Sequence, residues 1–288
     1  MTTDKWADWL LSRRDGGDED LRRRHAPELL AFRAGVLKRA AIREGDTVLD
    51  VGAGDGLIGF GALEQVGADG RVIFSDVSND LLDECRRRAG GDPRCSFVQA
   101  AAYDLAGIAD RSVDVVTTRS VLIYVARKPA AFAEFFRVLR PGGRLSVFEP
   151  INRFMAGHSA DLLGMDAGPV ADLVAKLRGA YAAVDADDGP MLDFDERDLL
   201  SFARGAGFTA IALDYRVRLD VPEPAPGEWD ALKRTAPNPL APTYEEAMAA
   251  TLTEEERDRM EAHFRALIAA GVPARRTMAT AFLRAVRA

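Results

Sequence analysis

Between residues 45 and 150, short apolar runs alternate with longer stretches of helical periodicity. Apolar runs of strand length cover Thr47–Val51, Val72–Asp76, Ser96–Gln99, Val113–Thr117 and Arg144–Glu149. Apolar residues recur at helical spacing over Leu57–Val66, Asn79–Arg88 and Pro129–Leu139. This alternation predicts a mostly parallel sheet that is covered by helices on both faces. Ligands of such sheets bind beyond the carboxyl ends of the strands.

The segment before the first strand shows two amphipathic helical patterns within residues 4–44. The first pattern places Trp6, Trp9 and Leu10 on one face. We expect the polar linker between the two patterns, Asp15–Asp20, to be mobile. A segment in this place can complete the core, and it can also fold over a ligand.

After the fifth strand, a mixed and partly helical stretch interrupts the alternation, and we interpret it as a cap. The alternation resumes with a helix at Asp195–Ala206 and a strand at Phe208–Leu219. A second helical interruption follows. Within it, Thr253 and Glu256 predict a capping box at the start of a helix. A strand at Thr277–Val286 closes the pattern.

These elements predict an α/β fold with a doubly wound, mostly parallel, seven-stranded sheet and helical cap insertions. A chain of 288 residues can bury a sizeable core in this arrangement. The expected organisation is an N-terminal helical segment at 1–44, an α/β core at 45–150, a cap insertion at 151–194, and the C-terminal part of the core at 195–288 with a helical insertion at 221–275.

The stretch Val48–Gly56, VLDVGAGDG, combines a short buried strand, three alternating glycines and the start of a helix. Glycine permits positive φ and leaves no Cβ between the backbone and a ligand. The helix that follows directs its free N–H groups and its positive dipole end at the turn. The combination predicts a site for a nucleotide-like ligand.

Two carboxylates refine this expectation. Asp76 ends the second strand, 22 residues after Gly54, where a ribose-binding carboxylate belongs in a doubly wound fold. Asp50 precedes the first glycine, and its negative charge disfavours a pyrophosphate and favours an ammonium group. The spacing Gly54-x-Gly56-x-x-Gly59 also matches the dinucleotide fingerprint in form, so a nicotinamide cofactor stays an alternative at this point.

Four segments occur in the order VLDVGAGDG, RVIFSDVS, VDVVTTRSVLIYV and FFRVLRPGGRLSVFEP. Together they resemble the successive motifs of the class I S-adenosylmethionine-dependent methyltransferases. The resemblance is specific from Gly45 to Pro150, and it extends more loosely, by strand order, to the last two predicted strands. It implies a Rossmann-like fold, S-adenosylmethionine as the cofactor and a methyl-transferring enzyme.

The resemblance also implies roles for individual residues. Gly52 and Gly54 would contact the methionine part of the cofactor. Asp76 would hold the ribose, and Asp50 would orient the methionine end through hydrogen bonds. Val77 would lie against the face of the adenine ring.

The loop after the third strand would complete the adenine site. The resemblance implies that the backbone at Ala102 and Tyr103 meets the adenine edge. Many family members carry an acidic residue for the adenine amino group at the position of Ala101. This chain lacks that residue, although Asp104 is nearby.

Further contacts with the cofactor are expected from two other segments. Arg119 and Ser120, just past the fourth strand, match the site whose backbone carbonyl often receives the cofactor ammonium group in the family. Arg33, on the second N-terminal helix, is a candidate cofactor contact, and its structural alternative is a solvated arginine.

Methyl transfer from a sulfonium is an in-line displacement with a neutral leaving group, so alignment and exclusion of water can supply much of the acceleration. A general base is optional. The candidates at the acceptor are Tyr124 after the fourth strand, Glu149 at the end of the fifth, and His158 in the cap. Each has a structural alternative, namely packing under the cap, hydrogen bonding to backbone and a surface position, respectively.

Composition restricts the other classes of function. The net charge of −7 and the pI near 5.2 argue against a dedicated nucleic-acid binder. No apolar run approaches the roughly 18 residues that cross a bilayer, and the first residues lack the features of a secretory signal, so we expect a cytoplasmic protein with no membrane partner. Because Cys85 and Cys95 are its only cysteines, neither a disulfide framework nor a metal site is predicted.

We therefore predict an S-adenosylmethionine-dependent methyltransferase that acts on a small molecule at O, N or C. The acceptor would lie under the N-terminal segment and the two helical insertions. One alternative is a non-methylating S-adenosylmethionine-binding protein that regulates a partner or shapes another reaction, such as a cyclisation. Others are a nicotinamide-dependent oxidoreductase and a methyltransferase with a protein or RNA acceptor. The oligomeric state is not predicted.

Overall fold

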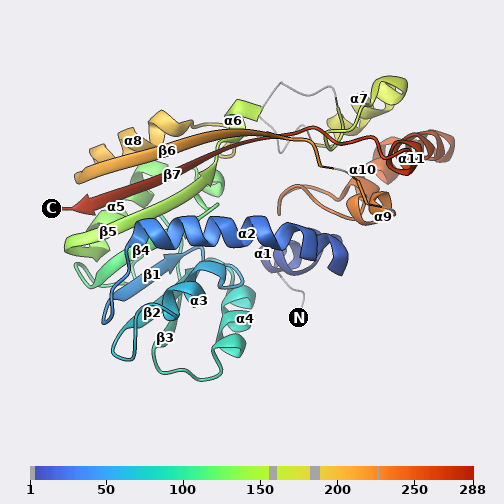
Figure 1. Cartoon of the computed structure of the whole chain (residues 1–288). Coiled ribbons are helices and arrows are strands. Elements are labelled where there is room, and N and C mark those ends of the chain that lie inside the picture. The colour runs from blue at the N-terminus through green and yellow to red at the C-terminus, as the bar shows by residue number, and fades with distance from the viewer. Residues whose placement is uncertain (1–3, 156–160, 182–188, 223, 226) are drawn as a thin grey trace.

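The computed structural model describes residues 4–288 except 156–160, 182–188, 223 and 226. Its strands form one sheet in the order β3-β2-β1-β4-β5-β7-β6 (Figure 1). Strands β1 to β5 are mutually parallel, and β7 lies antiparallel between β5 and β6. The predicted doubly wound, mostly parallel, seven-stranded fold is confirmed.

The strand bounds are β1 Thr47–Val51, β2 Arg71–Asp76, β3 Cys95–Gln99, β4 Val113–Arg119, β5 Leu139–Pro150, β6 Phe208–Asp220 and β7 Arg276–Arg287. The main difference from the expected bounds is in β5, which begins at Leu139 rather than at Arg144. Its register with β4 shifts between Val113 and Val115. Residues 140–143 therefore form a bulge within the strand.

Helices cover both faces of the sheet. They are α2 Glu19–Ala40, α3 Leu57–Leu63, α4 Asn79–Ala89, α5 Lys128–Val138 and α8 Glu196–Gly205. Val36 of α2 and Ile58 of α3 belong to one buried cluster, and Phe132 of α5 and Leu199 of α8 belong to another. The sheet thus has an apolar core on each face, as the near-continuous apolar strands require.

The N-terminal segment begins with α1 (Lys5–Asp8) and continues as a π-helical stretch at Trp9–Arg13. Asp4 caps α1, because its carboxylate accepts from the backbone N–H groups of Trp6 and Ala7 at 2.9 and 3.0 Å. Figure 1 shows α1 close to the N-terminal end of α2. The two predicted helical patterns are therefore present.

The expected mobile linker at Asp15–Asp20 is instead a packed turn. The Asp15 side chain is buried. A Cβ at Gly16 would lie 2.6 Å from the carbonyl oxygen of Ala231 in α9 (Glu228–Leu232). The polar composition of the turn does not reveal this packing, because the contact is made by a helix more than 200 residues away in the chain.

The two interruptions of the alternation pack together in a cluster of their own. Their remaining elements are α6 Asn152–Met155, the 3-10 helix η3 Gly168–Val170, α7 Ala171–Gly179, α10 Tyr244–Thr251 and α11 Glu254–Ala269. Figure 1 shows α7, α9, α10 and α11 grouped beyond the ends of β6 and β7, and we call these four helices the helical unit. The predicted capping box of Thr253 and Glu256 begins α11. In the described part of the chain, no helix has the length and apolarity needed to cross a membrane.

The centre of the helical unit yields a test of its packing. Trp229 and Phe264 are fully buried and stack with their ring centroids 4.8 Å apart. We expect Phe264→Ala to lower the free energy of unfolding by about 3–5 kcal/mol, because it leaves a cavity in a closed cluster. Urea titration followed by tryptophan fluorescence measures this loss. Leu219→Ala, at a side chain that is 75% exposed, is the control, with a change within about 0.5 kcal/mol.

Candidate active site

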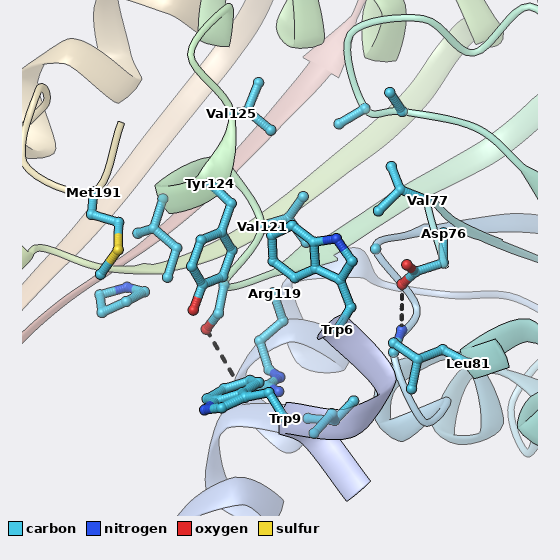
Figure 2. Close-up of a pocket in the computed structure, with 18 of the residues that line it drawn as sticks. Trp6, Trp9, Asp76, Val77, Leu81, Arg119, Val121, Tyr124, Val125 and Met191 are labelled. Carbon is cyan, nitrogen blue, oxygen red and sulfur yellow. Dashed lines mark hydrogen bonds between the residues drawn. The ribbon is translucent and has the colours of Figure 1, made fainter. Parts of the chain in front are cut away.

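A cavity of about 560 Å³ lies at the carboxyl ends of β1, β2 and β4. Gly52, Asp76 and Arg119 line it from the three strand ends. Figure 2 shows Asp76 and Arg119 together with Trp6 and Trp9, which reach the cavity from the N-terminal segment. The volume is typical of a small-molecule site, and its place agrees with the rule for doubly wound sheets.

The glycine turn after β1 approaches its neighbours too closely for other residues. Gly52, Gly54 and Gly56 have φ of 67°, 57° and 84°. A Cβ at Gly52 would lie 2.1 Å from Cγ2 of Val121, and one at Gly54 would lie 3.0 Å from a methyl group of Leu10. The turn therefore presents bare backbone to the cavity.

Asp50 lies directly behind this turn and is almost fully buried. Its Oδ1 accepts a hydrogen bond from the Thr117 hydroxyl at 2.9 Å, and its Oδ2 has no partner among the described residues. Burial raises the pKa of Asp50 to about 7. A buried acceptor without a donor is costly, so this oxygen is suited to a donor that arrives with a ligand.

Asp76 closes the next side of the cavity. Its Oδ2 accepts from the Gly54 backbone N–H and its Oδ1 from the Ser78 backbone N–H, both at 2.9 Å. Burial raises the pKa of this carboxyl above its usual value. Each oxygen keeps a second acceptor position, so the carboxylate is held in place with capacity for two hydroxyl groups.

The expected adenine wall is present along the cavity. Val77, Ala101, Ala102 and Tyr103 all line it. The Tyr103 ring lies under the Arg127 guanidinium, 4.0 Å from its central carbon. The described lining offers no acidic side chain on this loop, since Asp104 lies outside it.

The segment after β4 forms the opposite wall. Arg119 lines the cavity, and its Nη1 lies 3.5 Å from the hydroxyl oxygen of Ser120. Ser120 has a φ of 54°, a left-handed conformation that is uncommon for residues with a Cβ. Burial lowers the pKa of Arg119. The single-turn 3-10 helix η2 (Leu122–Tyr124) follows.

The three candidate catalytic residues have different positions. Tyr124 lines the cavity, and its ring meets the Trp6 ring edge to face at 5.1 Å. Burial raises the pKa of its hydroxyl well above the usual value. Glu149 is fully buried outside the lining, and its oxygens accept from the backbone N–H groups at the start of η2, which favours the structural alternative. His158 lies outside the described residues.

Arg33 is not where we expected it. Its guanidinium pairs with Glu64 at 2.6 Å and lies against Gly61 of α3, and Arg33 is not part of the cavity lining. Arg33 is therefore not among the residues that the structure brings to the cavity, and its contact with the cofactor stays a prediction. The sequence shows that a helix carries an arginine, but the rotation of α2 against the sheet decides where that side chain points.

Sequence reasoning did not single out Trp6, Trp9 and Arg14 as site residues, although all three line the cavity. The N-terminal segment that carries them is tied to both sides of the site. Asp4 accepts a hydrogen bond from the Ser78 hydroxyl at 2.6 Å, and the Trp9 indole N–H donates to the Ala236 carbonyl at 2.9 Å. The aromatic face that we predicted for this segment was the available signal.

The residues present fit S-adenosylmethionine. The unpartnered Oδ2 of Asp50 suits an ammonium group, the bare turn at Gly52 suits a close amino-acid backbone, and Asp76 suits a ribose diol. Gly52 and Asp76 line the same cavity, and Asp50 lies directly behind the turn that begins at Gly52.

Comparison with known proteins agrees with this fit. A model of a methyltransferase domain matches residues 48–143. The chain is 32% identical over 184 residues to the demethylmenaquinone methyltransferase of Clavibacter sepedonicus, covering 62% of this chain and 72% of that protein. It is 34% identical over 113 residues to the arsenite methyltransferase of Halobacterium salinarum, covering 39% of this chain and 29% of that protein.

A solved structure resembles the chain in fold. Phosphoethanolamine N-methyltransferase 2 of Haemonchus contortus, in complex with S-adenosylmethionine, aligns with a TM-score of 0.50 and 17% identity over 98% of this chain and 56% of that chain. The chain belongs to the class I S-adenosylmethionine-dependent methyltransferases. It is an enzyme of that class with S-adenosylmethionine as its cofactor, which decides between the two cofactors that the glycine spacing left open.

The close contact at Gly52 predicts the effect of a single methyl group. Gly52→Ala should lower the affinity for S-adenosylhomocysteine roughly 10–100-fold, because the turn must move away from Val121 and from the ligand. Isothermal titration calorimetry measures this change. Gly17→Ala is the matched control, because Gly17 has a similar φ of 68° and nothing within 4 Å of its Cβ position. Equal losses in the two variants would contradict the prediction.

The raised pKa of Asp50 predicts a pH dependence of cofactor binding. Below pH 7 the carboxyl is increasingly protonated in the free enzyme, so a bound ammonium group loses its partner. We expect the affinity for S-adenosylhomocysteine to fall, by up to about tenfold per pH unit, as the pH decreases from 7 to 5.5. Asp50→Asn should bind more weakly at pH 7.5 and show a flatter profile. An unchanged slope in this variant would assign the titration to another group.

Proposed function

We propose that this enzyme transfers the methyl group of S-adenosylmethionine to a small, mainly apolar acceptor that contains a ring, such as a phenol or a quinol. One observation carries the proposal. Apart from the residues assigned to the cofactor, the cavity is lined mainly by aromatic and other apolar side chains, among them Trp6, Trp9, Leu29, Val121, Ile123, Tyr124, Val125, Met191 and Pro237.

The proposed roles in cofactor binding follow from the walls already described. Asp50 orients the ammonium group, Gly52 and Gly54 present their backbone to the methionine part, and Asp76 holds the ribose. The adenine lies along Val77, with the loop that contains Ala102 and Tyr103 at its edge. The remaining space, beside the ring pair of Tyr124 and Trp6, is then left for the acceptor.

The aromatic end of the cavity suits a flat acceptor. Trp6 and Tyr124 form a corner, with their ring planes inclined at 73°. Figure 2 shows Met191 and Val125 on the same side as Tyr124. Offset and edge-to-face contacts with aromatic rings stabilise a ring of the acceptor beyond the burial of its area.

The bound cofactor supplies an electrophilic methyl group on a sulfonium. The residues of the chain would align the acceptor and exclude water, which suffices for much of the acceleration of an in-line displacement. The Tyr124 hydroxyl stays protonated at neutral pH because burial raises its pKa, so it would act as a hydrogen-bond donor to an acceptor oxygen rather than as a base.

The names of the relatives point to two kinds of acceptor, and the described residues favour one. A demethylmenaquinone acceptor carries a fused ring, in agreement with the aromatic lining. The arsenic(III) of arsenite is a soft acceptor, and soft acceptors prefer thiolate ligands. Cys85 and Cys95 both lie outside the lining, and burial raises the pKa of the Cys85 thiol. The apolar ring-containing acceptor is therefore the better-supported proposal.

An acceptor panel tests the proposal. The enzyme would be incubated with methyl-labelled S-adenosylmethionine and matched sets of naphthoquinols, catechols, simple phenols, aliphatic amines, thiols and arsenite. We expect label transfer to the aromatic hydroxyl compounds at rates that rise with ring size. Transfer to arsenite or to aliphatic amines alone would contradict the proposal.

Tyr124→Phe separates the hydroxyl group from the ring. We expect kcat/KM for the acceptor to fall about tenfold, the loss of one hydrogen bond, with unchanged affinity for S-adenosylhomocysteine. Initial rates and calorimetric titration measure the two quantities. Tyr215→Phe, on β6 and outside the cavity lining, is the matched control and should retain both values. Full activity of Tyr124→Phe would indicate that the tyrosine lines the cavity and that its hydroxyl group has no role in the reaction.

A further inference from the structure

Two arginines of the described lining, Arg14 and Arg119, bring guanidinium groups to the cavity from different segments. Arg119 follows β4, and Arg14 lies in the N-terminal segment just after the π-helical stretch. Figure 2 shows the Arg119 side chain pointing into the cavity on the side of Trp9. The assigned cofactor contacts, which involve Asp50, Asp76 and backbone groups, do not use either side chain.

The two guanidinium groups differ in their partners. Arg14 contacts the buried Asp15 carboxylate at 3.2 Å. Arg119 forms no ion pair with any described carboxylate, and its nearest polar side-chain contact is the Ser120 hydroxyl. Arg119 is half-buried at the cavity wall, and a partly desolvated cation without an anion is costly. Arg119 is therefore suited to an anion that comes with a ligand.

The position of Arg119 relates it to the glycine turn. Its pKa is lowered by burial, raised by the charge of Asp55 in the turn, and lowered by the nearby charge of Arg14. Because β4 pairs with β1, Arg119 lies near the glycine turn and hence near the methionine end of the cofactor site, and Arg14 lines the same cavity. Asp50 is also at this end, and its charge alone would repel a carboxylate.

We propose that the side chains of Arg119 and Arg14 together bind the carboxylate of the methionine part of S-adenosylmethionine. The arrangement pairs opposite charges twice, with Asp50 for the ammonium group and the two arginines for the carboxylate. Guanidinium groups match the planar shape of a carboxylate, and such hydrogen bonds are stronger than neutral ones.

This assignment gives the N-terminal segment a second role. Besides covering the acceptor with Trp6 and Trp9, the segment would contact the cofactor itself through Arg14. The segment is also hydrogen-bonded to the C-terminal part of the chain, since the Ala236 backbone N–H donates to the Arg13 carbonyl at 2.9 Å. Binding of a cofactor that carries the methionine carboxylate would thereby hold the N-terminal segment over the site. The competing occupant is an anionic group of the acceptor.

The proposal rests on the use of S-adenosylmethionine and not on the identity of the acceptor, so its test contains no acceptor. Two ligands are compared by calorimetry, S-adenosylhomocysteine and S-adenosyl-3-thiopropylamine, which lacks only the carboxylate. The wild-type enzyme should prefer the first about 10- to 100-fold. Arg119→Gln should reduce this preference to about threefold or less, while its affinity for the amine without carboxylate stays within about twofold.

Further variants make the test specific. Arg14→Gln should reduce the preference in part, and Arg119→Lys should keep an intermediate preference because the charge remains without the planar fork. Arg87→Gln, at an exposed ion pair on α4, is the matched control and should retain the wild-type preference.

Three results would overturn the proposal. The first is a wild-type enzyme that binds the two ligands equally, and the second is an equal loss for both ligands in Arg119→Gln, which indicates a structural role. The third is an Arg119→Gln enzyme that keeps the full preference, which would assign the arginine to the acceptor. None of them depends on whether the acceptor panel succeeds.

Discussion

The carboxylate of Glu149 accepts hydrogen bonds from the backbone N–H groups of Val121, Leu122 and Ile123 at 2.9, 2.9 and 3.3 Å. This contact holds the segment after β4 against the end of β5. Val121 is thereby placed so close to Gly52 that no Cβ fits between them. The wall of the cavity that faces the glycine turn depends on this one buried carboxylate, and so do the positions of Arg119 and Tyr124 beside it.

Burial of carboxylates recurs around the site with different consequences. Glu149 and Asp50 both have pKa values raised to about 7 by burial. Glu149 is surrounded by backbone donors, whereas Asp50 has one oxygen without a described donor. The first therefore stabilises the fold of the turn, and the second retains capacity for a ligand. Two buried carboxylates at strand ends therefore have different roles, and the number of hydrogen-bond donors around each one distinguishes them.

The cavity is built from four parts of the chain that are far apart in sequence, one of which, the insertion at 151–194, supplies Met191. The α/β core supplies the strand ends, the N-terminal segment supplies Trp6, Trp9 and Arg14, and the C-terminal part supplies Pro237. Arg13 also forms an ion pair with Glu246 of α10, which connects the N-terminal segment to the helical unit. Substitutions in the N-terminal segment and in the insertions can therefore change the specificity for the acceptor without altering the residues of the core that face the cofactor.

The sequence by itself determined the sheet, the helices of the core and the cofactor side of the site. The periodicities that predict strands and helices are local properties of the sequence. Asp50, Gly52 and Asp76 lie at strand ends, and parallel pairing brings these ends to the same edge of the sheet. Only the tertiary structure decided the outer walls. The rotation of α2 sends Arg33 to Glu64, backbone donors from another segment surround Glu149, and folding of the N-terminal segment brings Trp6 to Tyr124. Each of these contacts joins residues that are distant in the sequence, and local sequence patterns cannot predict it because it depends on how whole helices and strands pack against each other.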